Sequence, residues 1–332
     1  MDSEIRKLEL ANQELLNSDD IPVLENQETV YRSGSTNNPK QTLPFSRLLL
    51  PLAFTGILKP HKMVDETHKA IQIMLPGTGT TFSVAETLCD IAGTFHGRKS
   101  KNRGIKRQAD RCVSNQNKKF RVASFPADLP LNGMASDSPF EFASERGIIA
   151  MIRHVHLVLR KLYPNLPIFI SGRSTGGAAA ISYAQHYDDI SGVIAINPPY
   201  PDSELLQYTI KYMEDRANTL DELLNATGIA LHPDSWNAFK IFMPLFSYTR
   251  RPSLSPTLIL ISSNDPLNFY PYYAQALQNF ANENNNRTIQ IINADNNNLW
   301  DRKLVDTYHE VVSSQFQFIS HQLDLSNSMD IK

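Results

Sequence analysis

The chain has 332 residues, of which 41% are hydrophobic and 20% charged, a composition typical of a soluble globular protein. Its formal net charge of -2 argues against a general nucleic-acid binder, and its two cysteines provide neither a disulfide framework nor the spacing of a zinc site. The first residues carry no apolar signal-peptide core. The longest apolar run, 48–58, is interrupted by Pro51 and is too short to span a bilayer. We therefore expect a soluble protein that is cytoplasmic or is delivered without a general secretory signal.

Residues 1–65 are predicted to precede the main domain, which we expect to span 66–332. Leucine and isoleucine residues spaced among charges predict an amphipathic helix over Ser3–Leu16. A polar linker rich in Asn, Ser and Pro follows, with one short strand at Thr29–Tyr31. The apolar segment after it, within 47–60, is expected to pack on the core, or alternatively to contact lipid or a partner protein.

The main domain alternates apolar runs of strand length with helical patterns. The strand-like runs are Lys69–Leu75, Phe120–Phe125, Ile168–Ile170, Gly192–Asn197, Thr257–Ile261 and Thr288–Ile292. Helical spacing of apolar residues predicts long helices over 140–162 and 311–323. This alternation is typical of an α/β domain, in which a mostly parallel sheet is covered by helices on both faces.

A basic insertion, 96–119, lies between the first two of these strands, and its cations run from Arg98 to Arg121. Such a run is usually a solvated loop, but it would also be attracted to an anionic membrane or a phosphorylated headgroup. Few aromatic residues are interleaved with the cations, which argues against binding of single-stranded nucleic acid.

The most informative motif is Gly172-Arg-Ser-Thr-Gly176, which joins a buried strand to an alanine-rich helix. Strand, sharp turn and helix form the context in which G-x-S-x-G is a nucleophile elbow, with the serine hydroxyl exposed above the sheet. The glycines allow strand and helix to approach closely while the serine adopts a strained backbone conformation. The alternative is a serine that merely caps the helix.

With this motif the sequence resembles the α/β-hydrolase superfamily, in particular its serine esterases and lipases, over roughly Lys69 to Leu325. The resemblance implies a mostly parallel sheet with a helical lid, for which the strand-free segment 201–250 has the matching position. It also implies the chain order nucleophile, acid, base. Ser174 is then the nucleophile.

The resemblance implies a base after the last strand, which makes His309, just ahead of the terminal helix, the expected base. Asp265, at the end of the strand before it, is the expected acid, and its alternative role is an Asx turn ahead of Pro266. Asp202 and Asp295 are alternative acids.

The oxyanion hole is expected to use the backbone N–H of Thr175 and one from Thr78 or Gly79 in the loop after the first strand. Read as a phosphate-binding loop, that segment lacks both the G-K-[ST] and the G-x-G-x-x-G patterns.

These residues predict a serine hydrolase that cleaves carboxylic esters through an acyl-enzyme, with no metal or cofactor. The expected substrate is a small-molecule or lipid ester. Two alternatives remain open. One is acyl transfer at the same site, and the other is a catalytically silent hydrolase-like scaffold that binds an anionic membrane or a protein partner.

Overall fold

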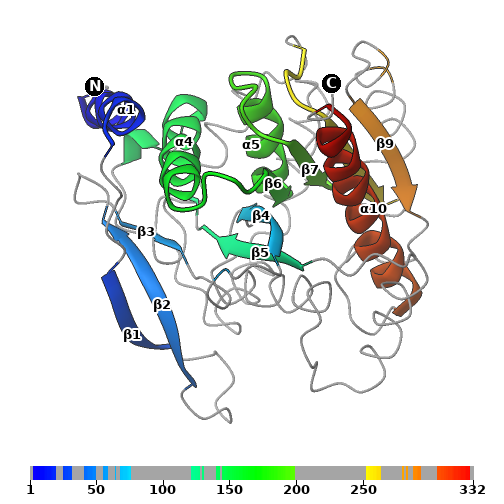
Figure 1. Ribbon diagram of the computed structural model, residues 1–332, viewed down its shortest axis with the longest axis horizontal. Coiled ribbons are helices and arrows are strands. Elements are labelled where there is room, and N and C mark those ends of the chain that lie inside the picture. The colour runs from blue at the N-terminus through cyan, green and yellow to red at the C-terminus, as the bar shows by residue number, and fades with distance from the viewer. Residues whose placement is uncertain are drawn as a thin grey trace, which may run out of the picture.

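The computed structural model describes residues 3–19, 25–31, 41–49, 55–58, 64, 68–75, 121–127, 129–130, 140–142, 144–198, 252–262, 279, 282, 287–292 and 305–329. The predicted sheet is present as six parallel strands in the order β5-β4-β6-β7-β8-β9 (Figure 1). The strands are β4 (His68–Leu75), β5 (Arg121–Pro126), β6 (Ile168–Arg173), β7 (Gly192–Ile196), β8 (Thr257–Ser262) and β9 (Arg287–Ile292). Every strand that the apolar runs predicted is confirmed to within one residue at its start.

Alternate residues of the strands belong to two separate cores, one on each face of the sheet. Ile168 and Ile170 of β6 belong to the core beneath α4 (Glu145–Leu162) and α5 (Thr175–Ala184). Phe169, between them, belongs to the opposite core, which α10 (Val305–Met329) covers. Because both faces are buried, the strands are continuously apolar instead of alternating.

The helix before β6 is fixed by its ends as well as by its apolar face. The short 3-10 helix η2 (Phe140–Phe142) precedes α4, and Ser144 caps α4 by accepting a hydrogen bond from the backbone N–H of Gly147 at 3.1 Å. The basic residues Arg160 and Lys161 occupy its last turn, where they complement the helix dipole. The helix predicted over 140–162 therefore begins only at Glu145, and a separate 3-10 helix occupies Phe140–Phe142.

The N-terminal helix α1 (Ser3–Asn17) packs directly on α4, as Figure 1 shows. Ile5 and Leu8 are buried in the same core as α4 and α5. Burying side chains of this size contributes about 1.5–3 kcal/mol each. The predicted helix is confirmed, and it is joined to the sheet-bearing part of the chain by a shared core.

Residues between α1 and β4 form a three-stranded antiparallel sheet of β1 (Glu25–Tyr31), β2 (Gln41–Leu49) and β3 (Thr55–Leu58). The strand predicted at Thr29–Tyr31 is thus the end of a longer one, inside a segment that the sequence favoured as a linker. The polar residues at the start of β1 carry no local strand pattern and are strand residues because they pair with β2.

The terminal helix differs most from its prediction. It begins at Val305 and ends at Met329, whereas apolar spacing predicted 311–323. No helix in the described part of the chain combines the length and the hydropathy that a bilayer crossing requires.

Candidate active site

Ser174 lies between the last residue of β6 and the first residue of α5. Its backbone has φ 50° and ψ −121°, a combination that residues with a Cβ rarely adopt. Positive φ at a serine costs of order 1–3 kcal/mol and persists only where the surrounding structure enforces it. The residue is partly exposed, so a strained backbone and solvent exposure occur at the same residue.

The enforcing contacts come from the glycines of the motif. A Cβ at Gly172 would lie 2.0 Å from the carbonyl oxygen of Gly176, which no side chain tolerates. A Cβ at Gly177 would lie 3.1 Å from the carbonyl oxygen of Gly172 and 3.3 Å from Cβ of Pro198. The strand end and the helix start are therefore in backbone contact, and the chain between them has room only for a sharp turn.

Ser174 does not cap α5. Its side chain makes no capping hydrogen bond, and its φ and ψ lie outside the extended region that N-cap residues use. Its main chain is nevertheless fully engaged, because its N–H donates to the carbonyl of Ile196 at 2.9 Å and its carbonyl accepts from the N–H of Ala178 at 3.1 Å. The capping alternative is therefore wrong, and Ser174 occupies a sharp turn between strand and helix.

The helix behind the elbow is buried throughout, and its first six residues are small. Thr175 begins it, with no exposed surface, and Ala178, Ala179 and Ala180 are equally buried. Small side chains let the helix axis lie close to β6 and β7, with which it makes most of its contacts. The N-terminus of α5 is thereby held at the carboxyl edge of the sheet, where its dipole favours developing negative charge.

Asn197, the residue after β7, lies at the same carboxyl end of the strands, and the sequence did not predict a role for it. Its φ is 42°, and its side-chain Oδ1 accepts a hydrogen bond from the N–H of Ser262 at 2.8 Å. It is 7% exposed. The signal in the sequence was an asparagine followed by proline at the end of a buried strand, since asparagine is enriched among residues with positive φ.

The remaining predicted site residues are not described at the side-chain level. Thr78, Gly79, Asp202, Asp265 and Asp295 lie outside the described residues, as do the basic insertion 96–119 and the lid segment 201–250. The backbone of His309 is described, and it is the fifth residue of α10. The expectation that this histidine lies just ahead of the helix is therefore wrong, because the helix starts four residues before it.

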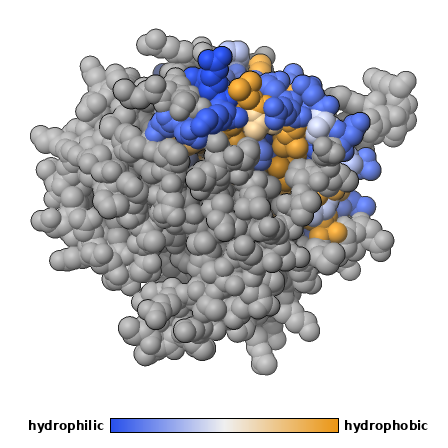
Figure 2. All heavy atoms as spheres, turned by 90° about the vertical axis from the view of Figure 1, so that its left-hand side faces the viewer, coloured by the Kyte–Doolittle hydropathy of each residue, from blue (hydrophilic) through white to orange (hydrophobic). Residues whose placement is uncertain are grey.

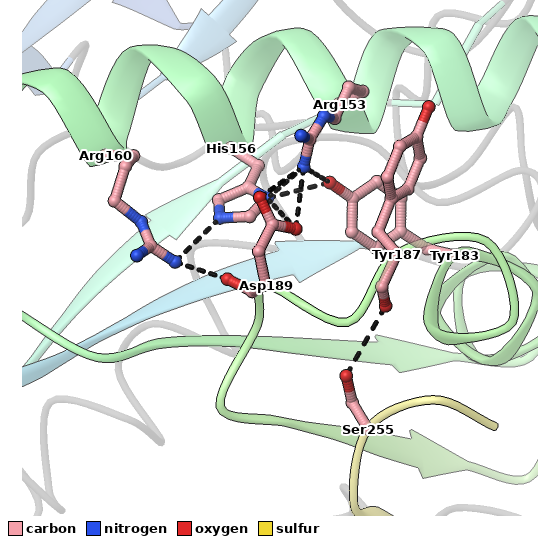
Figure 3. A network of polar contacts seen from close by, with 7 residues as sticks. All are labelled: Arg153, His156, Arg160, Tyr183, Tyr187, Asp189 and Ser255. Atoms are coloured by element: carbon pink, nitrogen blue, oxygen red, sulfur yellow. Dashed lines mark hydrogen bonds and ion pairs between the residues drawn. The ribbon is translucent and has the colours of Figure 1, made fainter. Parts of the chain in front are cut away.

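On the face of the sheet that α4 and α5 cover, a polar network joins these two helices and the loop before β7 (Figure 3). Nη1 of Arg153 donates to both carboxylate oxygens of Asp189 at 2.7 Å and to the hydroxyl of Tyr183 at 3.2 Å. Nδ1 of His156 lies 2.7 Å from the same hydroxyl, and Arg160 donates to the backbone carbonyl of Asp189.

The electrostatics of this network favour a neutral His156 beside a charged pair. Burial lowers the pKa of His156 to about 3, against the opposing charge of Asp189. Burial tends to raise the pKa of Asp189, but its hydrogen bonds with Arg153 and the nearby positive charges outweigh this and hold the pKa below its ordinary value. The guanidinium of Arg153 also lies 4.2 Å from the ring centroid of Tyr187.

The network is structural and not part of the elbow site. Asp189 precedes the first residue of β7, and Ser255, whose hydroxyl donates to the carbonyl of Tyr187 at 3.4 Å, precedes β8 (Figure 3). Ser174 follows the last residue of β6. In a parallel sheet Asp189 and Ser255 therefore lie at the amino ends of the strands, and Ser174 lies at the carboxyl ends. The network fixes the amino ends.

A groove of about 640 Å³ lies between α1 and α4 and is likewise separate from Ser174. Its lining includes Arg6, Leu10, Leu16, Arg146, Leu157 and Tyr187. Leu10 and Leu16 are 56% and 51% exposed, and Figure 2 shows apolar and charged side chains intermingled over this face. None of the predicted catalytic residues lines this groove.

Comparisons with known proteins support the architecture. No protein-family model matches the sequence, and no curated protein matches it. Among solved structures, MenH from S. aureus is similar with a TM-score of 0.53 and 16% identity, covering 82% of this chain and 99% of that chain. A carboxylesterase structure from the ammonia-oxidizing thaumarchaeon Nitrososphaera gargenis is similar with a TM-score of 0.52 and 10% identity, covering 83% of this chain and 99% of that chain.

Both similar structures are α/β-hydrolases, and they are aligned over nearly their whole length. The parallel sheet, the helices on both of its faces and the strained serine between β6 and α5 agree with that architecture. This chain therefore has the α/β-hydrolase fold.

Proposed function

We propose that the protein is a serine hydrolase that cleaves carboxylic esters with Ser174 as its nucleophile. The observation that carries the proposal is the strained backbone of Ser174, φ 50° and ψ −121°, at a partly exposed residue whose hydroxyl makes no capping bond. Strain of this kind is retained where it serves function. The similarity of the fold to a carboxylesterase structure agrees with ester chemistry.

In the proposed reaction, Ser174 Oγ forms a bond to the acyl carbon while His309 takes the hydroxyl proton. The carbonyl electron pair moves onto the oxygen, where the N–H of Thr175 and that of Thr78 or Gly79 stabilise it. Collapse breaks the ester C–O bond, and the leaving alcohol receives the proton. Water then repeats the sequence and releases the acid.

A serine hydroxyl is weakly nucleophilic at neutral pH, so the proposal needs a base held by an acid. Asp265 is proposed to orient His309, with Asp202 and Asp295 as the alternative acids. The substrate is proposed to be a small-molecule or lipid ester, bound beneath the lid segment 201–250. The sequence-adjacent N–H of Thr175 is the oxyanion donor closest to the elbow.

Labelling with a fluorophosphonate tests the nucleophile directly, because an activated serine displaces fluoride and forms a covalent bond to phosphorus. The wild-type chain is expected to label at Ser174, and the Ser174→Ala variant is expected not to label at any residue. Peptide mass spectrometry locates the adduct. A folded wild-type chain without a Ser174 adduct overturns the proposal.

A second experiment assigns the acid and the base. Removing the base or the acid of a triad costs roughly 10⁴-fold or more in kcat. We expect His309→Gln and Asp265→Asn to lose ester hydrolysis on this scale, whereas Asp202→Asn and Asp295→Asn keep it within about tenfold. A large loss in one of the last two variants, with Asp265→Asn active, would transfer the role of the acid to that residue.

A further inference from the structure

The carboxyl edge of the sheet holds a second strained residue beside the elbow. Ser174 and Asn197 are the two non-glycine residues with positive φ in the described ranges of the chain. They follow neighbouring parallel strands, β6 and β7. Asn197 is 7% exposed, so its conformation is set by contacts within the protein and not by solvent.

The hydrogen bonds of Asn197 depart from a regular parallel ladder. Since Ile196 pairs with Leu260, the next position would donate its N–H to Leu260 and accept the N–H of Ser262 at its own main-chain carbonyl. The N–H of Asn197 does donate to Leu260 at 2.8 Å. However, the N–H of Ser262 donates to the side-chain Oδ1 of Asn197, also at 2.8 Å.

The side-chain amide therefore takes the place of a backbone carbonyl. Positive φ turns the main chain of Asn197 out of the sheet toward Pro198, and Oδ1 fills the ladder position left behind. β8 is thereby hydrogen-bonded through Ser262, although β7 has already ended at Ile196. One asparagine thereby bonds the last residue of β8 to the chain that follows β7, while on its other side β8 pairs with β9 up to the same residue, Ser262 with Ile292.

Ile196 and Asn197, which are consecutive, bond to the elbow and to the end of β8, respectively. The carbonyl of Ile196 accepts the N–H of Ser174 at 2.9 Å, and the side chain of Asn197 accepts the N–H of Ser262 at 2.8 Å. Asp265 follows Ser262 by three positions in the sequence. The main chain of the proposed nucleophile and the strand that leads to the proposed acid are thus anchored side by side.

The end of β8 also contains a buried hydroxyl, that of Ser262. Oγ of Ser262 is fully buried and has no hydrogen-bond partner within the part of the chain that the structure describes. An unpaired buried hydroxyl lowers stability.

We propose that Asn197 is a positioning residue of the hydrolase site, because its side-chain amide ties Ser262 of β8, three positions before Asp265, to the chain beside Ser174. The inference rests on the proposed function. Asn197 acts through the strand and makes no contact with substrate in this scheme. Its Oδ1 bonds the N–H of Ser262, next to the carbonyl of Ile196 that accepts the N–H of Ser174.

Two substitutions separate the roles of the side chain and the backbone. Asn197→Gly keeps the positive φ without strain but removes the acceptor for the Ser262 N–H. Asn197→Asp keeps an oxygen at the position of Oδ1. We expect Asn197→Gly to lower kcat by roughly 10- to 100-fold with KM little changed, because small misplacements of catalytic groups have effects of this size. Asn197→Asp is expected to recover kcat to within about tenfold of the wild type.

The pH profile provides a readout that a purely structural role does not move. A carboxylate beside an imidazole favours the protonated ring. Displacing the acid in Asn197→Gly is therefore expected to move the acid limb of kcat/KM to lower pH, by about half a pH unit or more. Asn197→Asp is expected to keep the limb near that of the wild type.

The matched control is Asn12→Ala, which also removes a buried amide but lies in α1, away from the carboxyl edge. Thermal unfolding ranks the variants by stability, and kcat is compared between variants of similar stability. Equal kcat losses in Asn197→Gly and Asn12→Ala overturn the inference, as does an Asn197→Asp variant no better than Asn197→Gly. Fluorophosphonate labelling of the wild type separates the two failures, since a labelled Ser174 leaves the proposed function standing.

Discussion

Gly172 and Gly176 approach each other so closely that a Cβ on Gly172 would overlap the carbonyl group of Gly176, 2.0 Å from its oxygen and 2.2 Å from its carbon. The contact joins the end of β6 to the first turn of α5 through backbone atoms alone. Backbone atoms cannot rotate away as a side chain can. The geometry of the elbow is therefore fixed by one residue that lacks a side chain.

Gly172→Ala is expected to destabilise the fold severely, by about 4 kcal/mol or more, because only movement of β6 or α5 relieves the overlap. Gly177→Ala is the matched control. Its added Cβ would lie 3.1 Å from the carbonyl oxygen of Gly172, a tight contact that small shifts relieve, so we expect a cost of about 1 kcal/mol. Urea unfolding measures both, with soluble yield as the readout if Gly172→Ala fails to fold. Near-equal stabilities of the two variants would contradict the overlap.

The backbone strain at Ser174 predicts that activity and stability oppose each other at this residue. Glycine adopts φ 50° without a Cβ penalty, whereas alanine keeps the penalty. Ser174→Gly is therefore expected to be more stable than Ser174→Ala by about 1–2 kcal/mol, even though glycine is the more flexible residue in the unfolded chain. Both variants are expected to lose the fluorophosphonate adduct. If Ser174→Ala is the more stable of the two, the residue carries no strain.

The elbow and the sheet were predictable because their signals are local. A buried parallel strand is a short apolar run, and the glycines at 172 and 176 flank the serine in the same few residues. The start of α10 was not predictable from apolar spacing, because that spacing begins at Val311. The helix begins at Val305, in turns that are mostly polar.

The residues that couple distant parts of the chain could not be predicted from local pattern. Asn197 accepts from Ser262, 65 positions away, and Arg153 pairs with Asp189, 36 positions away. Nothing near these residues in the sequence marks the partner. The identities of the base and acid depend on the same kind of long-range approach, so His309 and Asp265 stay predictions.

The contact of α1 with α4 includes one buried amide, and this yields a prediction for the boundary expected near residue 65. Nδ2 of Asn12 donates to the carbonyl of Ala150 at 2.9 Å, and its Oδ1 lies 2.8 Å from Nδ1 of His154. Asn12→Ala removes the partner of His154 Nδ1 and the second hydrogen bond to the carbonyl of Ala150, which keeps its bond within α4. It is expected to cost about 1–3 kcal/mol of global stability. Gln13→Ala, at an exposed position of the same helix, is expected to be within about 0.5 kcal/mol of the wild type.

Chemical unfolding followed by two probes tests whether α1 belongs to the same cooperative unit as the sheet. One transition, shifted in Asn12→Ala, is expected by both far-ultraviolet circular dichroism and intrinsic fluorescence, because Ile5 and Leu8 share a core with α4 and α5. If Asn12→Ala instead separates an early transition from an unshifted main one, α1 folds independently and the boundary near residue 65 is a true domain boundary.

The two buried histidines of α4 predict that stability falls on mild acidification. Burial lowers the pKa of His154 to about 4 and that of His156 to about 3. The unfolded chain binds a proton at each below an ordinary pKa of about 6.5, whereas the folded chain does not until the lowered value is reached. The stabilisation by each neutral ring is therefore complete above about pH 6.5 and is lost as the pH falls toward the folded value.

Between about pH 7 and pH 5, each histidine is expected to cost roughly 2 kcal/mol of unfolding free energy, measured by urea unfolding at a series of pH values. His156→Gln removes one of the two protons that the histidines of α4 take up on unfolding, so the slope of stability against pH is expected to fall by the contribution of one histidine in this range. His154→Gln is expected to do the same, and the double variant to lose both contributions. The carboxylate of Asp189, whose pKa is held below its ordinary value, titrates below this window and adds nothing within it. An unchanged slope in both single variants would mean that the two rings are protonated or solvated in the folded protein, contrary to their burial beneath α1 and α5.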